Sequence, residues 1–271
     1  MIKFLKRKLR PYRSRIKIVF NQLGLNYLDS MSFSESDLIY RFYRKKAGKV
    51  MIDVGVHHGE SFYDYESMGW TIFGFEPDPS NRVKVKIGGK KTFLHDLAVS
   101  DVDDLELRFY TSDESSGVSG LVPFLESHQS SFTVKTITLE TFLKEKKLEY
   151  VSYLKIDTEG NDLLVLKGYP FVDLSPQIIM CEFEDKKTQH LGYTYKDMGE
   201  FLVNKGYKVL ISEWYPITKY GGQHKWRVIS EFNKDFRLSD NMAWGNFLAI
   251  KEVDYPLFKK VMDRYLKNLT N

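Results

Sequence analysis

The chain alternates between short apolar runs and longer stretches whose apolar residues recur at helical spacing. Residues 50–54, 71–76, 153–156 and 178–181 are short, mostly apolar, and rich in β-branched and aromatic residues. This composition predicts strands that are covered on both faces, as in a parallel sheet. Each of the four runs ends at or beside an acidic residue. The pattern therefore predicts an α/β fold with a doubly wound, mostly parallel sheet.

The same pattern predicts the elements around these strands. Ser34 and Asp37 resemble a helix cap, and apolar residues follow them at helical spacing. Other helices are expected at residues 59–68, 138–146, 195–205 and 256–266, and one more ends at Gly168. Other strands are expected at residues 92–101, 105–111, 132–136, 207–212, 226–229 and 246–250. The Ser- and Gly-rich residues 111–120 are expected to form a mobile loop.

The turn after the first apolar run contains two glycines, Gly55 and Gly59, preceded by Asp53. Gly55 permits a sharp turn, and Gly59 permits close approach of the backbone to a ligand. A dinucleotide-binding fingerprint needs a third glycine, so the spacing disfavours a pyrophosphate site. Asp53 could pair with an ammonium while N–H groups of the turn face a carboxylate. The turn therefore favours a ligand that ends in an amino acid, such as S-adenosylmethionine.

Glu76 ends the second apolar run, 23 residues after Asp53. In nucleoside-binding α/β sheets, an acid at this position accepts hydrogen bonds from the ribose hydroxyls. The alternative is a strand-end acid that caps the next helix, with Pro77 and Pro79 as ordinary turn residues. The glycine turn before it favours ribose binding.

Two further acids follow the third and fourth runs. Asp157 and Glu159 stand in a short turn, and Glu182 closes the run at 178–181. Carboxyl ends of parallel strands meet at the edge where open α/β sheets bind ligands. We therefore expect these acids to line one cleft together with Asp53 and Glu76.

Composition and charge limit the function classes. A chain of 271 residues with 42% hydrophobic and 28% charged residues is expected to form one globular α/β domain, assigned here to residues 48–271. The single Cys181 excludes a disulfide framework within the chain and a clustered cysteine metal site. It also favours a reducing, cytoplasmic location.

Residues 1–47 are predicted to be a basic, helical N-terminal extension. The first 17 residues contain eight Lys or Arg and no acid. The apolar run at 18–20 is too short for a signal peptide or a membrane span. The extension is either a solvated basic leader or a peripheral contact with an anionic membrane at its inner face. Nucleic acid is disfavoured as a partner, because basic residues form no stripe across the rest of the chain.

Several motifs resemble the FkbM family of methyltransferases. In chain order they are Asp53-Val54-Gly55 with Gly59-x-Ser61, Phe75-Glu76-Pro77, Ala98-Val99-Ser100-Asp101, Lys155-Ile156-Asp157-Thr158-Glu159-Gly160, and Val165-Leu166-x-Gly168. The resemblance extends from about residue 49 to residue 182, with weaker support from residues 244–250. It implies a Rossmann-like class I methyltransferase fold with an antiparallel C-terminal strand, S-adenosylmethionine as cofactor, and a sugar or glycan hydroxyl as acceptor.

The resemblance also implies roles for individual residues. Asp53, Gly55 and Gly59 would bind the methionine end of the cofactor, and Asp157 could bind its ammonium. Glu76 would bind the ribose, with Asp96 and Ala98 near the adenine. The remaining residues expected at the cofactor are His57, His58, Ser61 and Pro77. His57 replaces an Asn of the family and is expected to make a hydrogen bond near the cofactor.

No metal site is predicted. Adjacent residues on one turn, such as His57 and His58, rarely converge on one ion, and no third ligand is evident. The alternative is a hard cation held by the oxygens of Asp157 and Glu159.

An alcohol acceptor needs a base to take its proton. Glu159, Glu182 and Asp157 are the candidates; because Asp157 is also placed to bind the cofactor, Glu159 or Glu182 is preferred. Aromatic residues around residues 221–224 could stack on sugar rings, or could belong to the core of a small sheet. The alternative functions are an RNA-binding or RNA-modifying methyltransferase, and a cofactor-binding pseudoenzyme that scaffolds glycan assembly.

Overall fold

The structure is a computed structural model, and it describes residues 33–44, 46, 49–112, 116–124, 126, 128–220 and 222–270. The basic leader at residues 1–17 therefore lies outside the described residues, as does most of the predicted extension. None of the described helices is both long and apolar enough to cross a membrane.

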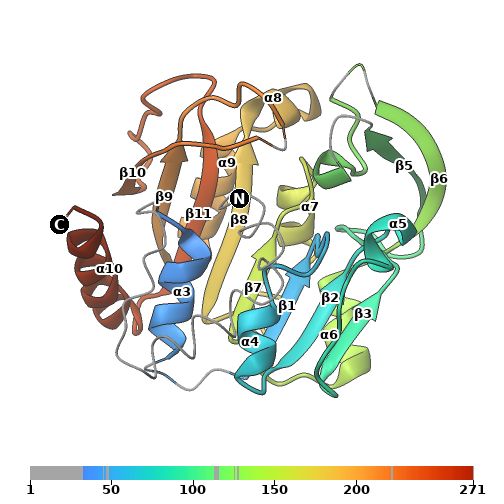
Figure 1. Ribbon diagram of the computed structural model, residues 1–271, viewed down its shortest axis with the longest axis horizontal. Coiled ribbons are helices and arrows are strands. Elements are labelled where there is room, and N and C mark those ends of the chain that lie inside the picture. Colours follow the sequence, from blue (N-terminus) through green and yellow to red (C-terminus); the bar gives the residue numbers. More distant parts are fainter. Residues whose placement is uncertain are drawn as a thin grey trace, which may run out of the picture.

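An eight-stranded sheet forms the centre of the molecule (Figure 1). Its strand order is β10-β9-β11-β8-β7-β1-β2-β3. The parallel strands are β1 (Val50–Val54), β2 (Thr71–Phe75), β3 (Thr92–His95), β7 (Tyr153–Ile156) and β8 (Ile178–Glu184). The sheet ends with β11 (Trp244–Lys251), β9 (Tyr207–Trp214) and β10 (Trp226–Glu231), each antiparallel to its neighbours. The predicted doubly wound, mostly parallel sheet with an antiparallel C-terminal strand is confirmed.

A second, three-stranded sheet stands beside the carboxyl ends of β2 and β3 (Figure 1). It contains β4 (Ala98–Val99), β5 (Glu106–Ser112) and β6 (His128–Ile137). The run predicted as one strand and its exit at 92–101 is thus divided between two sheets, because β4 pairs with β6. The short helix η2 (Ser116–Val118) lies between β5 and β6, within the segment expected to be a loop.

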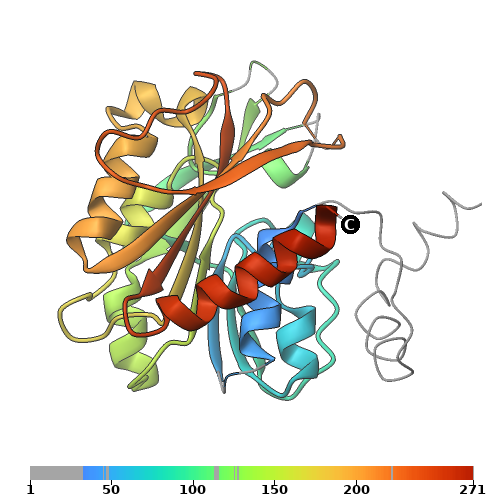
Figure 2. The same cartoon turned by 90° about the vertical axis from the view of Figure 1, so that its left-hand side faces the viewer.

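Helices cover both faces of the large sheet, as Figure 2 shows. On one face lie α3 (Glu35–Tyr43), α4 (Tyr63–Ser67) and α10 (Tyr255–Thr270), whose apolar residues belong to one core cluster. On the other lie α6 (Leu139–Lys146), α7 (Asp162–Lys167) and α9 (Tyr195–Asn204), which belong to the other cluster. The short elements α5 (Pro79–Arg82), α8 (Asp185–Thr188) and η3 (Gln189–Leu191) connect them. Burying each large apolar side chain contributes about 1.5–3 kcal/mol, so this two-sided burial stabilises the three-layer arrangement.

Local sequence signals account for the helix boundaries. The hydroxyl of Ser34 accepts a hydrogen bond from the Asp37 N–H, as the predicted cap requires. Thr138 caps α6 in the same way. The helix predicted at 59–68 is shorter, because Gly59 adopts a φ of 85° and the chain turns until α4 begins at Tyr63.

Candidate active site

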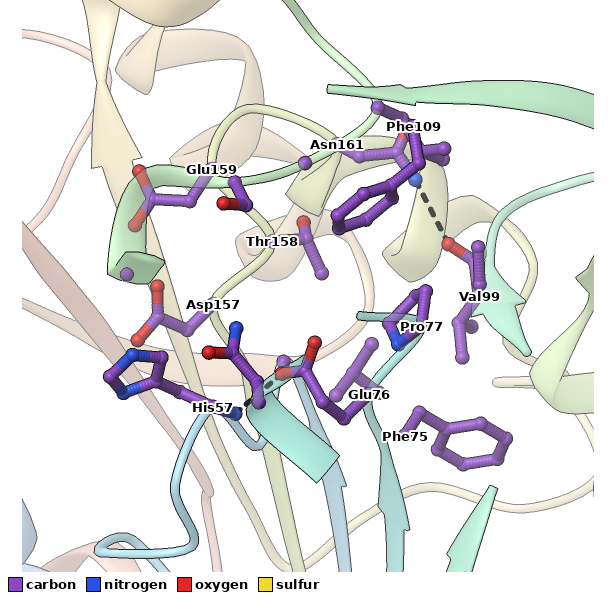
Figure 3. A pocket seen from close by; sticks show the side chains of 18 of the residues that line it. His57, Phe75, Glu76, Pro77, Val99, Phe109, Asp157, Thr158, Glu159 and Asn161 are labelled. Carbon is purple, nitrogen blue, oxygen red and sulfur yellow. Dashed lines mark hydrogen bonds between the residues drawn. The ribbon is translucent and has the colours of Figure 1, made fainter. Parts of the chain in front are cut away.

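A cleft of about 590 Å³, counting its open mouth, lies at the carboxyl ends of β1, β2 and β7. This is the position at which open α/β sheets bind ligands, and the volume suits a small molecule. Figure 3 shows Phe75, Pro77, Val99 and Phe109 on one side of it and His57, Asp157 and Glu159 on the other. Of the residues predicted for the site, Gly55, His57, Glu76, Pro77, Ala98, Asp157 and Glu159 line this cleft.

The glycine turn is shaped by contact with β7 rather than by the ligand alone. Gly55 has a φ of 83°, and a Cβ built on it would lie 1.8 Å from the backbone oxygen of Asp157. No other residue fits there without moving the backbone. This close approach places the turn at Gly55 directly beside Asp157 at the cleft.

Asp53 lies behind the cleft, which corrects the expectation that it lines it. Its carboxylate is fully buried and lies 3.1 Å from the ammonium of Lys155. The hydroxyl of Ser61 donates a hydrogen bond to it. Burial raises the pKa of Asp53, and Lys155 opposes that shift. Lys155 thus supplies an ammonium partner for Asp53 within the protein, and Asp53 is not among the residues that line the cleft.

No role was predicted for Lys155 from the sequence, although it contacts three residues in this part of the site. Its ammonium donates to the backbone oxygen of Gly55 at 3.0 Å and lies 3.5 Å from the carboxylate of Asp157. Burial opposes its charge, but attraction by Asp53 and Asp157 raises its pKa. A lysine inside an otherwise apolar strand was the available signal. The side chain of Asp157 stays 41% exposed, so it, rather than Asp53, can meet a ligand's ammonium.

Glu76 links the first two strands at the cleft. Its carboxylate accepts hydrogen bonds from the backbone N–H groups of His57, at 2.6 Å, and Asp78, at 3.0 Å (Figure 3). Burial raises the pKa of Glu76 to about 7, although both hydrogen bonds oppose that shift. Asp78 separately caps α5, so the alternative role proposed for Glu76 belongs to its neighbour.

The two histidines have different surroundings. The rings of His57 and His58 stack with centroids 3.6 Å apart, but only His57 lines the cleft. Burial lowers the pKa of His57 to about 4, and His58 adds to the effect, so His57 is neutral near pH 7. His58, Gly59 and Ser61 stand behind the cleft wall. Neither His57 nor His58 belongs to the group of possible metal ligands found among the described residues.

The adenine end differs from the prediction at one residue. Asp96 is exposed and does not line the cleft, whereas Leu97, Ala98 and Val99 do. Asp96 follows the last residue of β3, at the point where the chain leaves the large sheet. The apolar wall formed after it is suited to the face of a purine ring.

A segment between β5 and β6 covers the cleft and was not predicted as part of the site. Ser116 lies 3.0 Å from Nε2 of His57, and its backbone oxygen accepts from the Asn81 amide at 3.3 Å. Asn81 is 2% exposed and lines the cleft, and its Oδ1 has no hydrogen-bond partner among the described residues. A buried polar atom without a partner is costly, so Oδ1 is available to a ligand's donor.

Acids from the turn after β7 and from the end of β8 converge on one buried cation that the sequence did not reveal. The ammonium of Lys187 lies 2.6 Å from Glu159, 2.7 Å from Glu182 and 2.9 Å from Glu184. Lys187 is 2% exposed. We call these four residues the lysine cluster. Its lysine comes from the polar stretch after β8, where no periodic pattern marks a buried residue.

Strained backbone directs Glu159 toward this cation. Glu159 has a φ of 59°, a conformation that L-residues seldom adopt, and Gly160 follows with a φ of 109°. Such strain costs about 1–3 kcal/mol and persists where surrounding contacts over-determine it. Because Glu159 also lines the cleft, it joins the lysine cluster to the ligand site.

Glu182 differs from its predicted position. β8 continues to Glu184, so Glu182 lies within the strand and does not line the cleft. Burial raises the pKa of Glu182 well above its ordinary value, and raises that of Glu159 to about 7, with Lys187 opposing both shifts. The two carboxylates therefore hold protons more tightly than solvent-exposed ones, and only Glu159 has access to a ligand.

Three carboxylates beside Lys187 lie close enough together to share a metal ion. Carboxylate oxygens of Asp157, Glu159 and Glu182 lie within 4.8 Å of one another, so a third oxygen ligand exists that the sequence did not indicate. The Lys187 ammonium contacts two of these three groups and supplies the compensating charge in this structure.

Comparison with known proteins identifies the family. A family model described as "Methyltransferase FkbM domain" matches residues 53–209, which is more than half of the chain. The chain belongs to the FkbM methyltransferase family. It is accordingly an S-adenosylmethionine-dependent methyltransferase, as the motifs predicted. No curated protein matches it by sequence.

Solved structures of other methyltransferases resemble the chain only distantly. A putative caffeoyl-CoA O-methyltransferase from Staphylococcus aureus is 10% identical, with a TM-score of 0.43, over 92% of this chain and 98% of the other. The precorrin-6y C5,15-methyltransferase from Geobacter metallireducens is 12% identical, with a TM-score of 0.42, over 83% and 92%. A magnesium protoporphyrin IX methyltransferase from Synechocystis PCC 6803 with bound SAM is 9% identical, with a TM-score of 0.38, over 80% and 77%.

The cleft fits the FkbM cofactor. Glu76, Asn81 and Asp157 all line it; Asn81 offers an acceptor without a partner among the described residues, and the Asp157 side chain is 41% exposed. A ribose, an adenine edge and an amino-acid ammonium each need one such group. S-adenosylmethionine supplies an electrophilic methyl group when it is bound.

Proposed function

We propose that this FkbM methyltransferase methylates a hydroxyl group of a sugar or glycan-containing acceptor, with Glu159 as the base. The observation that carries the proposal is the position of Glu159. Its carboxylate lines the cleft two residues after Asp157, and its side chain is 11% exposed. An alcohol is a poor nucleophile at neutral pH, and a carboxylate with a pKa of about 7 is well matched to accept its proton.

The lysine cluster supports this role. As Glu159 takes the proton, it loses its negative charge, and the Lys187 ammonium keeps Glu182 and Glu184 as partners. The proton therefore enters a site where a cation remains balanced by carboxylates. Asp157 would hold the cofactor's amino group, and neutral His57 would add a hydrogen bond without a competing positive charge.

Aromatic side chains around the lysine cluster support a sugar acceptor. The hydroxyl of Tyr220 donates to Glu184 at 2.9 Å, and the ring of Phe124 lies 5.4 Å from the Lys187 ammonium. His224 packs against Trp244, and both are half-buried. Rings and carboxylates in one place suit the C–H faces and hydroxyls of a sugar.

Two of the aromatic residues considered from the sequence belong to the core instead. Trp226 stacks on Phe33 with ring centroids 4.2 Å apart. The indole N–H of Trp214 donates to buried Glu35 at 2.7 Å. Both residues pack α3 and the residue before its cap against the sheet, so the proposal gives them no role at the acceptor.

The test is a methyl-transfer assay with S-adenosylmethionine that carries a deuterated methyl group. Acceptors would include free, nucleotide-linked and lipid-linked sugars, with RNA as the alternative substrate. The proposal expects an O-methylated sugar in the mass spectrum, and loss of that product in Glu159→Gln. Labelling of RNA alone, or labelling of sugars that persists at full rate in Glu159→Gln, would contradict it.

A further inference from the structure

A second recess lies between α3 and α10 and shares no residue with the active site. It has a volume of about 620 Å³, counting its open mouth, and we call it the arginine groove. Figure 2 shows the two helices next to one another, on the face of the sheet covered by α4. Its lining residues are Arg41, Arg44, Val261, Arg264, Tyr265 and Asn268.

The floor of the arginine groove is fixed by packing. Tyr265 and Val261 are 5% and 7% exposed. The hydroxyl of Tyr265 accepts a hydrogen bond from the backbone N–H of Ser34 at 3.2 Å, at the start of α3. The ring also packs on Phe33, with centroids 5.7 Å apart. These contacts set the spacing of the two helices, so the groove exists before any ligand arrives.

Arg41 is held in place by an aromatic ring, and one of its hydrogen-bond donors has no partner among the described residues. The guanidinium carbon of Arg41 lies 4.9 Å from the centroid of the Tyr265 ring. Its Nε is buried and has no hydrogen-bond partner among the described residues. Stacking on a ring restricts an arginine side chain and leaves the edge of its guanidinium free to donate. Arg41 is therefore prepared for an acceptor that the described protein does not provide.

The other two arginines add charge without compensation from the groove. Arg44 and Arg264 are exposed and come from different helices. No carboxylate lines the groove, and the described ion pairs include none of the three arginines. Asp37 and Asp263 are carried by the same helices, but neither is among the lining residues. Three like charges around one recess repel each other, and an anion would relieve that repulsion.

The donor set selects the kind of anion. Guanidinium groups bind the oxygens of carboxylates and phosphates through paired hydrogen bonds. A carboxylate has two oxygens, whereas a terminal phosphate offers three and carries more charge. Three arginines and the amide of Asn268 therefore match a phosphate better than a carboxylate. We propose that the arginine groove binds the phosphate group of a ligand, either a soluble phosphate ester or the headgroup of a phospholipid.

The test uses the full-length protein and two probes. Equilibrium dialysis with radiolabelled inorganic phosphate measures binding of a soluble phosphate, and flotation with vesicles that contain phosphatidic acid, whose headgroup is a terminal phosphate, or with pure phosphatidylcholine vesicles measures binding of a headgroup. The groove variant is Arg41→Gln/Arg44→Gln/Arg264→Gln. The matched control, Lys90→Gln/Lys147→Gln/Lys234→Gln, removes the same charge from exposed positions elsewhere. We expect at least about tenfold weaker binding by the groove variant in one arm or both, and a change of less than about twofold in the control.

Binding in dialysis alone assigns a soluble phosphate ester, and binding only to phosphatidic acid vesicles assigns a headgroup. Equal weakening by the groove and control variants, or no binding of either probe by the wild type, would overturn the proposal. A variant without residues 1–17 must keep the groove-dependent part of the binding; its complete loss would assign the effect to the leader. If the triple variant misfolds, the double variant Arg44→Gln/Arg264→Gln takes its place in both binding measurements, because these two residues are exposed.

Discussion

Replacing Lys187 by Met removes the one ammonium that contacts three buried glutamates. The distances of 2.6, 2.7 and 2.9 Å and the 2% exposure of Lys187 leave little room for water to replace it. Breaking a buried ion pair from one side costs about 3–5 kcal/mol, because the remaining charge is left without a partner. We expect Lys187→Met to lower the free energy of unfolding by about that amount at pH 7.

The loss should depend on pH. Burial raises the pKa of Glu159 to about 7 in the folded protein, whereas in the unfolded chain it is about 4.3. At pH 6, folded wild type and variant both hold the proton, so the missing ammonium matters less. Above pH 7 the wild-type Glu159 ionises next to Lys187, but the variant keeps its proton. The folded variant then binds more protons than the unfolded chain, and each pH unit adds up to about 1.4 kcal/mol to its deficit.

Urea denaturation at pH 6 and pH 8 measures both effects. The matched control is Lys186→Met, which makes the same change at the exposed neighbouring residue. The free energy of unfolding of that control should fall by no more than about 1 kcal/mol, which is the usual contribution of an exposed cation near an aromatic ring such as that of Tyr220. Adding Glu182→Gln to Lys187→Met should restore part of the stability at pH 8, since the neutral amide replaces a buried carboxyl group that ionises when the chain unfolds. Equal losses for Lys186→Met and Lys187→Met, or a Lys187→Met deficit that is the same at both pH values, would refute this reasoning.

Two further predictions concern the turn and the base. Gly55→Ala should destabilise the protein by more than about 4 kcal/mol in urea denaturation, because its Cβ would lie 1.8 Å from the Asp157 oxygen. The control is Gly69→Ala: Gly69 has a φ of 78°, but a Cβ there would meet open space, so this change should cost only about 1–2 kcal/mol. In single-turnover assays with an identified acceptor, Glu159→Gln should slow methyl transfer by about 10²–10⁴-fold with little change in cofactor affinity. Asp157→Asn should instead mainly weaken cofactor binding, and the reverse pattern would contradict the assigned roles.

The sequence predicted most of the fold because its strongest signals are local. Short apolar runs identified the parallel strands, and glycines and caps such as Ser34 marked the ends of helices. The family resemblance implied the class I methyltransferase fold and its antiparallel C-terminal strand, but not the order of the strands. The bend that moves β4 into a second sheet was missed, because two residues paired with the distant β6 carry no periodic signal of their own.

The acids at the strand ends were predicted from the sequence, but the buried lysines that pair with them were not. Asp157, Glu159 and Glu76 were correctly expected at one cleft. Asp53 was expected to face the ligand, yet Lys155 on the adjacent strand already pairs with it. Lys187 was missed for a related reason. Pairing between side chains on different elements depends on tertiary contact, and sequence spacing does not encode it.

We expect S-adenosylmethionine to bind in this cleft with Glu76 at its ribose. Calorimetric titration with S-adenosylhomocysteine at pH 8 and pH 6 tests it most directly. Burial raises the pKa of Glu76 to about 7, and the ionised form accepts from ribose hydroxyls, so affinity should fall by up to about tenfold at pH 6. Glu76→Gln should bind the ligand more weakly by roughly 1–3 kcal/mol at pH 8 and lose most of this pH dependence. Binding of NAD without binding of S-adenosylhomocysteine, or unchanged affinity in Glu76→Gln, would contradict the account.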